Sequence, residues 1–296
     1  MENWENILAA IAVLGGLSVL FGLILAAASK AFYVETDPRL EKLNDCLPCA
    51  NCGGCGYAGC SSYAEAVLSG EATIDKCASG GNESAQAMAA IMGVQAPTMT
   101  RRVALVRCSG EKIYNKDGNL IYGAKSKGNY EGIQDCLAAS KVGGRGPLAC
   151  KFGCLGYGNC VKACNYGAIS IQNGVAVVDE DLCVGCMACA SACPRELIVP
   201  VEPGQNVVIA CHSMAKGAVT TRGCTIGCVG CGLCSKICPN EAITVTKNLA
   251  TIDYSKCNNC GLCATVCPKK LIKDSNVENL PDPGLVHPRN NPDATV

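Results

Sequence analysis

The stretch CVGCMACASACP, residues 183–194, decides the fold, because its four cysteines follow the spacing CxxCxxCxxxCP. The same spacing recurs in CVGCGLCSKICP, residues 228–239, and in CNNCGLCATVCP, residues 257–268. Three thiolates two residues apart can bind three corners of one [4Fe–4S] cubane. The fourth, next to a proline that turns the chain away, reaches a second cubane. Zinc sites usually take two CxxC pairs, so the triple run favours iron–sulfur clusters over zinc.

The chain has 296 residues and 26 cysteines, a number that requires either a disulfide framework or metal ligation. Disulfide frameworks belong to secreted chains with a signal peptide. The N-terminus, MENWEN, is acidic where a signal peptide is basic, and most cysteines recur at two-residue gaps, so metal ligation is favoured. Basic and acidic residues balance at 25 each, which gives no support to nucleic-acid binding.

The cysteine-rich region contains an internal repeat. A shift of 74 residues places Cys154, Cys160, Cys164, Cys183, Cys186, Cys189 and Cys193 on Cys228, Cys234, Cys238, Cys257, Cys260, Cys263 and Cys267. The connecting segments, GAISIQNGVAVVDEDLC and EAITVTKNLATIDYSKC, each read as two short β-branched strands around a tight turn, with Asn173-Gly174 as a hairpin signal. We therefore expect an α+β fold with two tandem units of the bacterial-ferredoxin type, each built for two [4Fe–4S] clusters.

The crossing of the fourth ligands predicts the cluster ligands in both units. In the second unit we expect one cluster on Cys228, Cys231, Cys234 and Cys267, and one on Cys257, Cys260, Cys263 and Cys238. In the first unit we expect one cluster on Cys183, Cys186, Cys189 and Cys164. The remaining motif departs from the pattern, with Tyr157 in place of its second cysteine and Asn165 in place of proline. A nearby thiolate can replace the missing one, so the expected ligands are Cys150, Cys154, Cys160 and Cys193.

A separate module precedes the repeat. Its spacing is Cys52-x2-Cys55-x4-Cys60-x16-Cys77, inside NCGGCGYAGCSSYAEAVLSG, and its glycines let the backbone approach a cofactor closely. By spacing alone, these four cysteines fit zinc and [4Fe–4S] equally well.

Six cysteines remain after these five sites. Cys46 and Cys49 receive no role. Cys224 is the repeat-mate of Cys150, but its own motif already has Cys231, so it counts as free. The other three lie at the ends or edges of short elements, where distant ligands can converge. We expect a sixth [4Fe–4S] cluster on Cys108, Cys136, Cys211 and Cys224. The alternative is four buried free thiols.

Residues 7–28, ILAAIAVLGGLSVLFGLILAAA, carry no charge and span roughly 33 Å at about 1.5 Å per residue, which matches a bilayer core. The run is too long for the apolar part of a signal peptide and too uniformly apolar for a buried soluble helix. Acidic residues precede it, and Lys30, Arg39 and Lys42 follow it. The positive-inside bias therefore predicts a single-pass protein of the cell membrane whose cysteine-rich body lies on the cytoplasmic side.

The expected domains follow in chain order. They are a transmembrane anchor at residues 1–29, the four-cysteine module at 30–93, a tandem ferredoxin-like domain at 94–273 with motifs at 150–193 and 224–267, and an extended tail at 274–296.

The anchor, the NCGGCGYAGC…Cys77 module and the tandem CxxCxxCxxxCP pairs together resemble the RnfB family, the ferredoxin-like subunits of the Rnf complex. The resemblance covers nearly the whole chain and implies a [4Fe–4S] cluster on Cys52, Cys55, Cys60 and Cys77. It also implies two kinds of partner, the other Rnf membrane subunits and soluble ferredoxin as electron donor. The family couples electron flow between reduced ferredoxin and NAD⁺ to Na⁺ or H⁺ transport. The chain departs from the family's shorter members at Cys46 and Cys49 and in its second ferredoxin-like pair.

We therefore expect an electron-transfer subunit of a membrane-bound ion-translocating ferredoxin:NAD⁺ oxidoreductase, with no bond chemistry by side chains. No GxGxxG follows a predicted strand, so NAD⁺ is not expected to be reduced on this chain. One alternative is a polyferredoxin subunit of a hydrogenase or of a formate-oxidising complex, which co-purifying subunits would reveal. The other is a zinc-stabilised scaffold, which low-temperature EPR would distinguish from both.

Overall fold

The computed structural model describes residues 2–31, 37–110, 112–114 and 120–274. The chain divides into two compact units, Met1–Lys42 and Leu43–Val296. The predicted tail at 274–296 lies outside the described residues, except that Asp274 ends the last strand.

The N-terminal unit is dominated by α1 (Glu2–Ala31), a helix of 30 residues. Its segment Ile7–Lys30 is long and apolar enough to cross a membrane, and none of it is buried within the protein. Large apolar side chains such as Leu14, Leu23 and Leu25 are about two-thirds exposed. Burial of an apolar side chain from water is favourable by roughly 1.5–3 kcal/mol. A helix with this surface therefore needs an apolar environment, and a membrane supplies one.

The four-cysteine module is largely helical. Its helices are α2 (Pro38–Asp45), α3 (Cys60–Leu68) and α4 (Gly81–Met92). Tyr63 on α3 is buried, and its hydroxyl donates to Thr73 O at 2.8 Å and accepts from Lys76 N at 3.2 Å. These two bonds fix the loop that leads to Cys77. Gly93, in the left-handed conformation with φ of 68°, ends α4.

The first ferredoxin-like unit has two antiparallel two-stranded sheets. The outer pair in sequence order is β1 (Val103–Val106) with β6 (Ile198–Val201), and the inner pair is the hairpin of β4 (Ile169–Gln172) with β5 (Val175–Val178). Two short helices carry cysteines, α6 (Asn159–Lys162) and α7 (Ala188–Ser191). Asn173 and Gly174 both have positive φ, 48° and 78°, as the tight turn predicted from the sequence requires.

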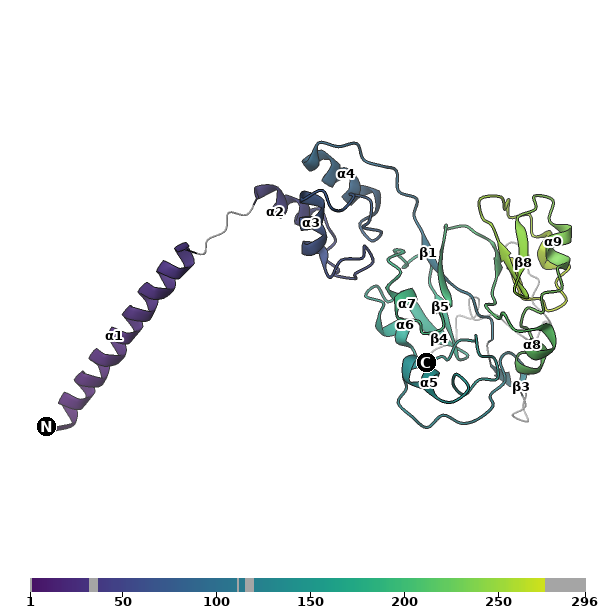
Figure 1. Ribbon diagram of the computed structural model, residues 1–296, viewed down its shortest axis with the longest axis horizontal. Helices are drawn as coiled ribbons and strands as arrows, with labels where there is room; N and C mark the ends of the chain where they lie inside the picture. The colour runs from purple at the N-terminus through teal and green to yellow at the C-terminus, as the bar shows by residue number, and fades with distance from the viewer. Residues whose placement is uncertain (1, 32–36, 111, 115–119, 275–296) are drawn as a thin grey trace. The chain divides into compact units, whose positions relative to one another are not determined.

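The second ferredoxin-like unit repeats this arrangement. Its elements are the outer pair β7 (Val207–Ile209) with β10 (Ile272–Asp274), the hairpin β8 (Ile243–Thr246) with β9 (Leu249–Ile252), and the helices α9 (Leu233–Ile237) and α10 (Leu262–Thr265). Additional elements outside the repeat are β2 (Ile113–Tyr114), β3 (Leu120–Tyr122), α5 (Cys136–Lys141) and α8 (Gly217–Gly223). Figure 1 shows the two ferredoxin-like units with their helices and hairpins in green and yellow. The structure confirms the predicted α+β fold class with an N-terminal apolar helix.

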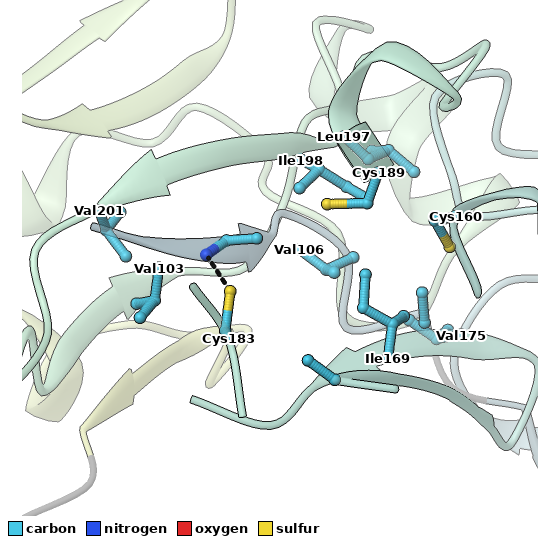
Figure 2. Packing of buried hydrophobic residues seen from close by; sticks show 13 residues of the cluster. Val103, Val106, Cys160, Ile169, Val175, Cys183, Cys189, Leu197, Ile198 and Val201 are labelled. Carbon is cyan, nitrogen blue, oxygen red and sulfur yellow. Dashed lines mark hydrogen bonds between the residues drawn. The ribbon is translucent and has the colours of Figure 1, made fainter. Parts of the chain in front are cut away.

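Cysteines form part of both hydrophobic cores. Figure 2 shows Cys160, Cys183 and Cys189 among the valines, isoleucines and leucine of the first ferredoxin-like unit. The backbone N–H of Ala104 on β1 donates to the sulfur of Cys183 at 3.4 Å, the dashed line in Figure 2. In the second core, Cys228, Cys234 and Cys263 take comparable places. With only 13 aromatic residues in the chain (3 Phe, 9 Tyr and 1 Trp), cysteine sulfur contributes much of the apolar packing.

Candidate iron–sulfur sites

The candidate sites are numbered 1 to 6, from the four-cysteine module to the second ferredoxin-like unit. A cavity in the second unit is lined by the cysteines Cys228, Cys231, Cys234 and Cys267, which we call site 5. Burial raises the pKa of the Cys234 thiol, and the neighbouring thiols of Cys228, Cys267 and Cys231 raise it further. Gly230, at φ of 69°, lies against the backbone of Asn248, where a Cβ would come within 2.8 Å. The loop therefore closes tightly over the cavity. These four residues are the ones that the crossing of fourth ligands predicts.

A matching cavity in the first ferredoxin-like unit is lined by the cysteines Cys136, Cys154, Cys160 and Cys193, which we call site 3. Burial, together with the neighbouring thiols of Cys154, Cys136, Cys193 and Cys189, raises the pKa of Cys160 to about 12. Cys136 is the first residue of α5, and its backbone N–H donates to the side-chain oxygen of Asn159 at 2.8 Å. Asn159 also donates to Asp135 at 2.7 Å, which ties the start of α5 to α6, the helix that carries Cys160.

A third cavity lies between the two ferredoxin-like units and is lined by the cysteines Cys108, Cys150, Cys211 and Cys224, which we call site 4. The site is nearly symmetric between the repeats. Cys108 accepts backbone hydrogen bonds from Gly110 and Cys154, and Cys211 accepts them from Ser213 and Cys228, all at 3.4 Å. The other two cysteines, Cys150 and Cys224, are themselves repeat-mates, 74 residues apart. Each repeat thus contributes two thiols.

The cavities of sites 3 and 4 group the cysteines differently from the ligand sets expected from the sequence. Cys136, expected with Cys108, Cys211 and Cys224, lies instead at site 3, and Cys150, expected at site 3, lies at site 4. The reason is a backbone connection. Ala149 donates to Lys125 O and Lys125 donates to Gly223 O, both at 2.9 Å. One segment therefore holds the loops before Cys150 and Cys224 together, where both cysteines line the cavity of site 4. The internal repeat is the sequence signal for this grouping, because the repeat-mates Cys150 and Cys224 are expected to share a role.

The four-cysteine module forms a fourth cavity, lined by the cysteines Cys52, Cys55, Cys60 and Cys77, which we call site 1. Burial raises the pKa of the Cys77 thiol. Cys186 of the neighbouring ferredoxin-like unit also lines this cavity. A Cβ on Gly54 would clash with the backbone carbonyl of Cys186. Asn165, which stands where the motif has proline, donates its side-chain amide to Ala50 O at 3.0 Å.

Two further groups complete the predicted motifs. Site 2 comprises Cys164, Cys183, Cys186 and Cys189; burial and the neighbouring thiols of the other three raise the pKa of Cys189 to about 11. Site 6 comprises Cys238, Cys257, Cys260 and Cys263, the repeat-mates of site 2. Burial, together with Cys234, Cys257 and Cys260, raises the pKa of Cys263 to about 11. Cys46, partly buried, and Cys49, exposed with φ of 51°, line none of the four cavities above.

The surroundings of these cysteines fit [4Fe–4S] clusters. Backbone N–H groups point at sulfur in sites 2, 4 and 6, as cluster-bound thiolates require. Two side chains that line these cavities also have buried polar atoms without a partner in the described residues, namely Arg195 at Nε and Nη1 beside site 3 and Ser109 at Oγ beside site 4. Cluster sulfur would provide acceptors for them. Among the described residues, no three Cys, His, Asp or Glu side chains converge closely enough for one metal ion, whereas a cubane holds its thiolates farther apart.

Three protein-family models match the chain. A model described as a putative Fe-S cluster matches residues 47–79, a 4Fe-4S binding domain matches residues 176–199, and a 4Fe-4S dicluster domain matches residues 227–271. The first contains site 1 and the third contains sites 5 and 6. The chain thus has the domains of a protein that binds [4Fe–4S] clusters.

Curated relatives match most of the chain. The B component of the Na⁺-translocating ferredoxin:NAD⁺ oxidoreductase complex of Acetobacterium woodii is 40% identical over 85% of this chain and 73% of its own length. The B component of the proton-translocating ferredoxin:NAD⁺ oxidoreductase complex of Clostridium ljungdahlii is 41% identical over 81% of this chain and 82% of its own length.

The B component of an ion-translocating oxidoreductase complex of Methanosarcina acetivorans is 37% identical over 83% of this chain and 90% of its own length. The chain belongs to the RnfB family. RnfB proteins are subunits of oxidoreductase complexes, so the resemblance seen in the sequence is confirmed. The apolar helix α1 fits the membrane association of such a complex.

Proposed function

We propose that the chain is the electron-transfer subunit of a membrane-bound ion-translocating ferredoxin:NAD⁺ oxidoreductase. In this role it accepts electrons from reduced soluble ferredoxin and relays them to the membrane subunits of the complex. The observation that carries the proposal is the continuous series of cysteine sites in a chain of the RnfB family. [4Fe–4S] clusters, when bound at these sites, supply one-electron transfer.

Contacts between neighbouring sites support a linear order from site 1 to site 6. Cys186 of site 2 lines the cavity of site 1. Cys189 of site 2 neighbours Cys160 of site 3. The backbone of Cys154 in site 3 donates to the sulfur of Cys108 in site 4.

The same kinds of contact continue through the second repeat. The backbone of Cys228 in site 5 donates to the sulfur of Cys211 in site 4, at 3.4 Å. Cys234 of site 5 neighbours Cys263 of site 6. Site 4 is therefore the junction between the two ferredoxin-like units. Without ligation at site 4, the relay would be divided into two separate halves.

The protein's part in this function is to hold thiolates in place and to exclude water. Several cysteines of sites 3 to 5 lie in or against the two cores. Burial raises the pKa of one or more thiols at each of these sites, namely Cys154 and Cys160 at site 3, Cys108, Cys211 and Cys224 at site 4, and Cys234 at site 5. Thiols with raised pKa values stay protonated at neutral pH unless iron binds them, so ligation and proton release are linked. We propose six [4Fe–4S] clusters, with about 24 irons per chain at four irons per site.

The proposed location is the membrane, with α1 as anchor and the cysteine-rich body on the cytoplasmic side. The basic residues that follow the apolar segment support this orientation. A cytoplasmic body would meet soluble ferredoxin directly.

The test is purification of the native complex, under anaerobic conditions, through a tag on this chain. We expect the other membrane subunits of an Rnf complex to co-purify, and reduced ferredoxin to bleach the visible absorbance of this chain. Co-purification of hydrogenase or formate-oxidising subunits instead would refute the proposed complex. An unchanged spectrum after addition of reduced ferredoxin would refute the proposed donor.

A further inference from the structure

Arg195 is a buried cation beside site 3. It lies two residues after Cys193, only 5% of its surface is exposed, and it lines the cavity together with the cysteines of the site. Its Nη2 donates to the backbone carbonyl of Arg145. Its Nε and Nη1 have no hydrogen-bond partner in the described part of the chain. The guanidinium forms no ion pair with any acidic side chain among the described residues.

A buried guanidinium without a counter-charge is costly, and arginine does not escape the cost by losing its proton. A negative group must therefore compensate it. Burial and the nearby Arg145 lower the pKa of Arg195, whereas the thiols of Cys150, Cys193 and Cys154 raise it. Cys193 and Cys154 line the cavity of site 3 together with Arg195, so the guanidinium lies beside these two thiols. A [4Fe–4S] cluster with four thiolates carries a net negative charge, and its sulfur atoms accept hydrogen bonds.

The repeat provides a natural comparison. Lys269 is the repeat-mate of Arg195 and lines the cavity of site 5. Its ammonium group donates to Thr225 O at 3.1 Å, and the residue is only partly buried. The cation at site 5 thus has a backbone partner and contact with water. At site 3, two nitrogens of the guanidinium have neither a backbone partner nor contact with water. The charge of Arg195 therefore acts on site 3 more strongly than the charge of Lys269 acts on site 5.

We propose that Arg195 donates hydrogen bonds from Nε and Nη1 to sulfur of the site 3 cluster and raises the reduction potential of that cluster. The physical reason is that reduction adds one negative charge, which a nearby buried cation stabilises. The same charge favours an electron arriving at site 3, just before the junction at site 4. Arg195 is a positioning residue that tunes the site without binding iron.

The experiment is an EPR-monitored redox titration of the fully loaded, full-length protein and of its Arg195→Gln, Arg195→Lys and Lys269→Gln variants. Arg195→Gln should keep the native iron content and lower the midpoint of the site 3 signal. The expected shift is about 59 mV or more, a tenfold change in the ratio of reduced to oxidised cluster. Arg195→Lys keeps the charge but loses the planar fork, so its shift should be smaller. Lys269→Gln should leave the site 3 midpoint unchanged.

The inference rests on the proposed function, and the Cys136→Ser variant separates the two. If Cys136→Ser leaves the site 3 signal intact, the proposed ligation of site 3 is wrong. If Cys136→Ser removes that signal but Arg195→Gln titrates like the native protein, only the role of Arg195 is wrong. If Arg195→Gln loses site 3 iron, Arg195→Lys decides. A loaded site whose midpoint lies less than about 59 mV below the native value supports a charge effect, and a larger shift or loss of iron refutes it.

Discussion

At the scale of the residue, two cysteines decide how many of the proposed cluster sites have four cysteines. Cys136 and Cys150 each stand outside the CxxCxxCxxxCP runs, and each completes a cavity that already has three cysteines. Cys136 takes the place that Cys231 occupies in the other repeat, where Tyr157 stands in this one. Tyr157 packs on Tyr130 with ring centroids 5.4 Å apart, beside the core that contains Cys136. The aromatic pair thus packs against the same small core as Cys136.

Serine substitutions at these two residues should remove different clusters. Cys136→Ser should eliminate the site 3 EPR signal and leave site 4 intact, and Cys150→Ser should do the reverse. Each should lower the iron content by about four irons per chain, because one cubane is lost. Cys49→Ser, at an exposed cysteine outside the cavities, is the matched control and should keep the iron content of the native protein. Loss of the site 3 signal in Cys150→Ser would return Cys150 to the ligands first expected from the sequence.

Gly54 controls how closely site 1 approaches site 2. Gly54→Ala would place a methyl group against the carbonyl of Cys186, so the module must move away from the ferredoxin-like unit. We expect full iron content, a weaker magnetic coupling between the clusters of sites 1 and 2, and slower electron transfer between them. Pulsed EPR and stopped-flow reduction measure these effects. Gly128→Ala is the control, because a Cβ there meets nothing within 4 Å. Unchanged coupling in Gly54→Ala would show that this contact does not set the separation of the two sites.

At the scale of the element, the two hairpins carry the same turn with different residues. The turn between β4 and β5 is Asn173-Gly174, and the turn between β8 and β9 is Lys247-Asn248, with φ of 49° and 61°. Lysine is poorly suited to a positive φ, whereas asparagine tolerates it. The second hairpin therefore contains local strain that the first avoids.

Exchanging the first turn residue between the two hairpins should change the free energy of unfolding in opposite directions. Lys247→Asn should stabilise the protein by about 0.5 kcal/mol, and the reciprocal Asn173→Lys should destabilise it by a similar amount. Thermal unfolding of the iron-loaded protein, with iron content checked, measures both. Equal transition temperatures for the two variants and the native protein would show that the conformation of these turns costs nothing.

At the scale of the whole molecule, the chain joins an exposed apolar helix to a body rich in metal ligands. Removal of residues 1–31 should release the protein from the membrane fraction but leave about 24 irons per chain, because no proposed ligand lies in α1. Ultracentrifugation followed by iron analysis measures this. Replacing residues 7–28 by another apolar helix should restore sedimentation with membranes. Sedimentation of the truncated chain with lipid alone would mean that the body binds membranes by itself.

The orientation of the body is a second property of the whole molecule. We expect protease added to intact cells to leave the body uncut, and protease added to inverted vesicles to digest it, because the basic residues after the apolar segment favour the cytoplasmic side. Digestion in intact cells would reverse the proposed orientation.

The sequence by itself determined the N-terminal apolar helix, the two tandem units, their hairpins and the CxxCxxCxxxCP runs that contribute to the proposed sites 2, 5 and 6. These features depend on residues close together in the chain or on a repeat visible in it. Only the tertiary structure decided which cavity Cys136 lines and which cavity Cys150 lines. The reason is that neither belongs to a local motif, and each is positioned by distant segments, Asn159 for Cys136 and residues 124–126 for Cys150. The burial of Arg195 likewise depends on long-range packing, which no local spacing encodes.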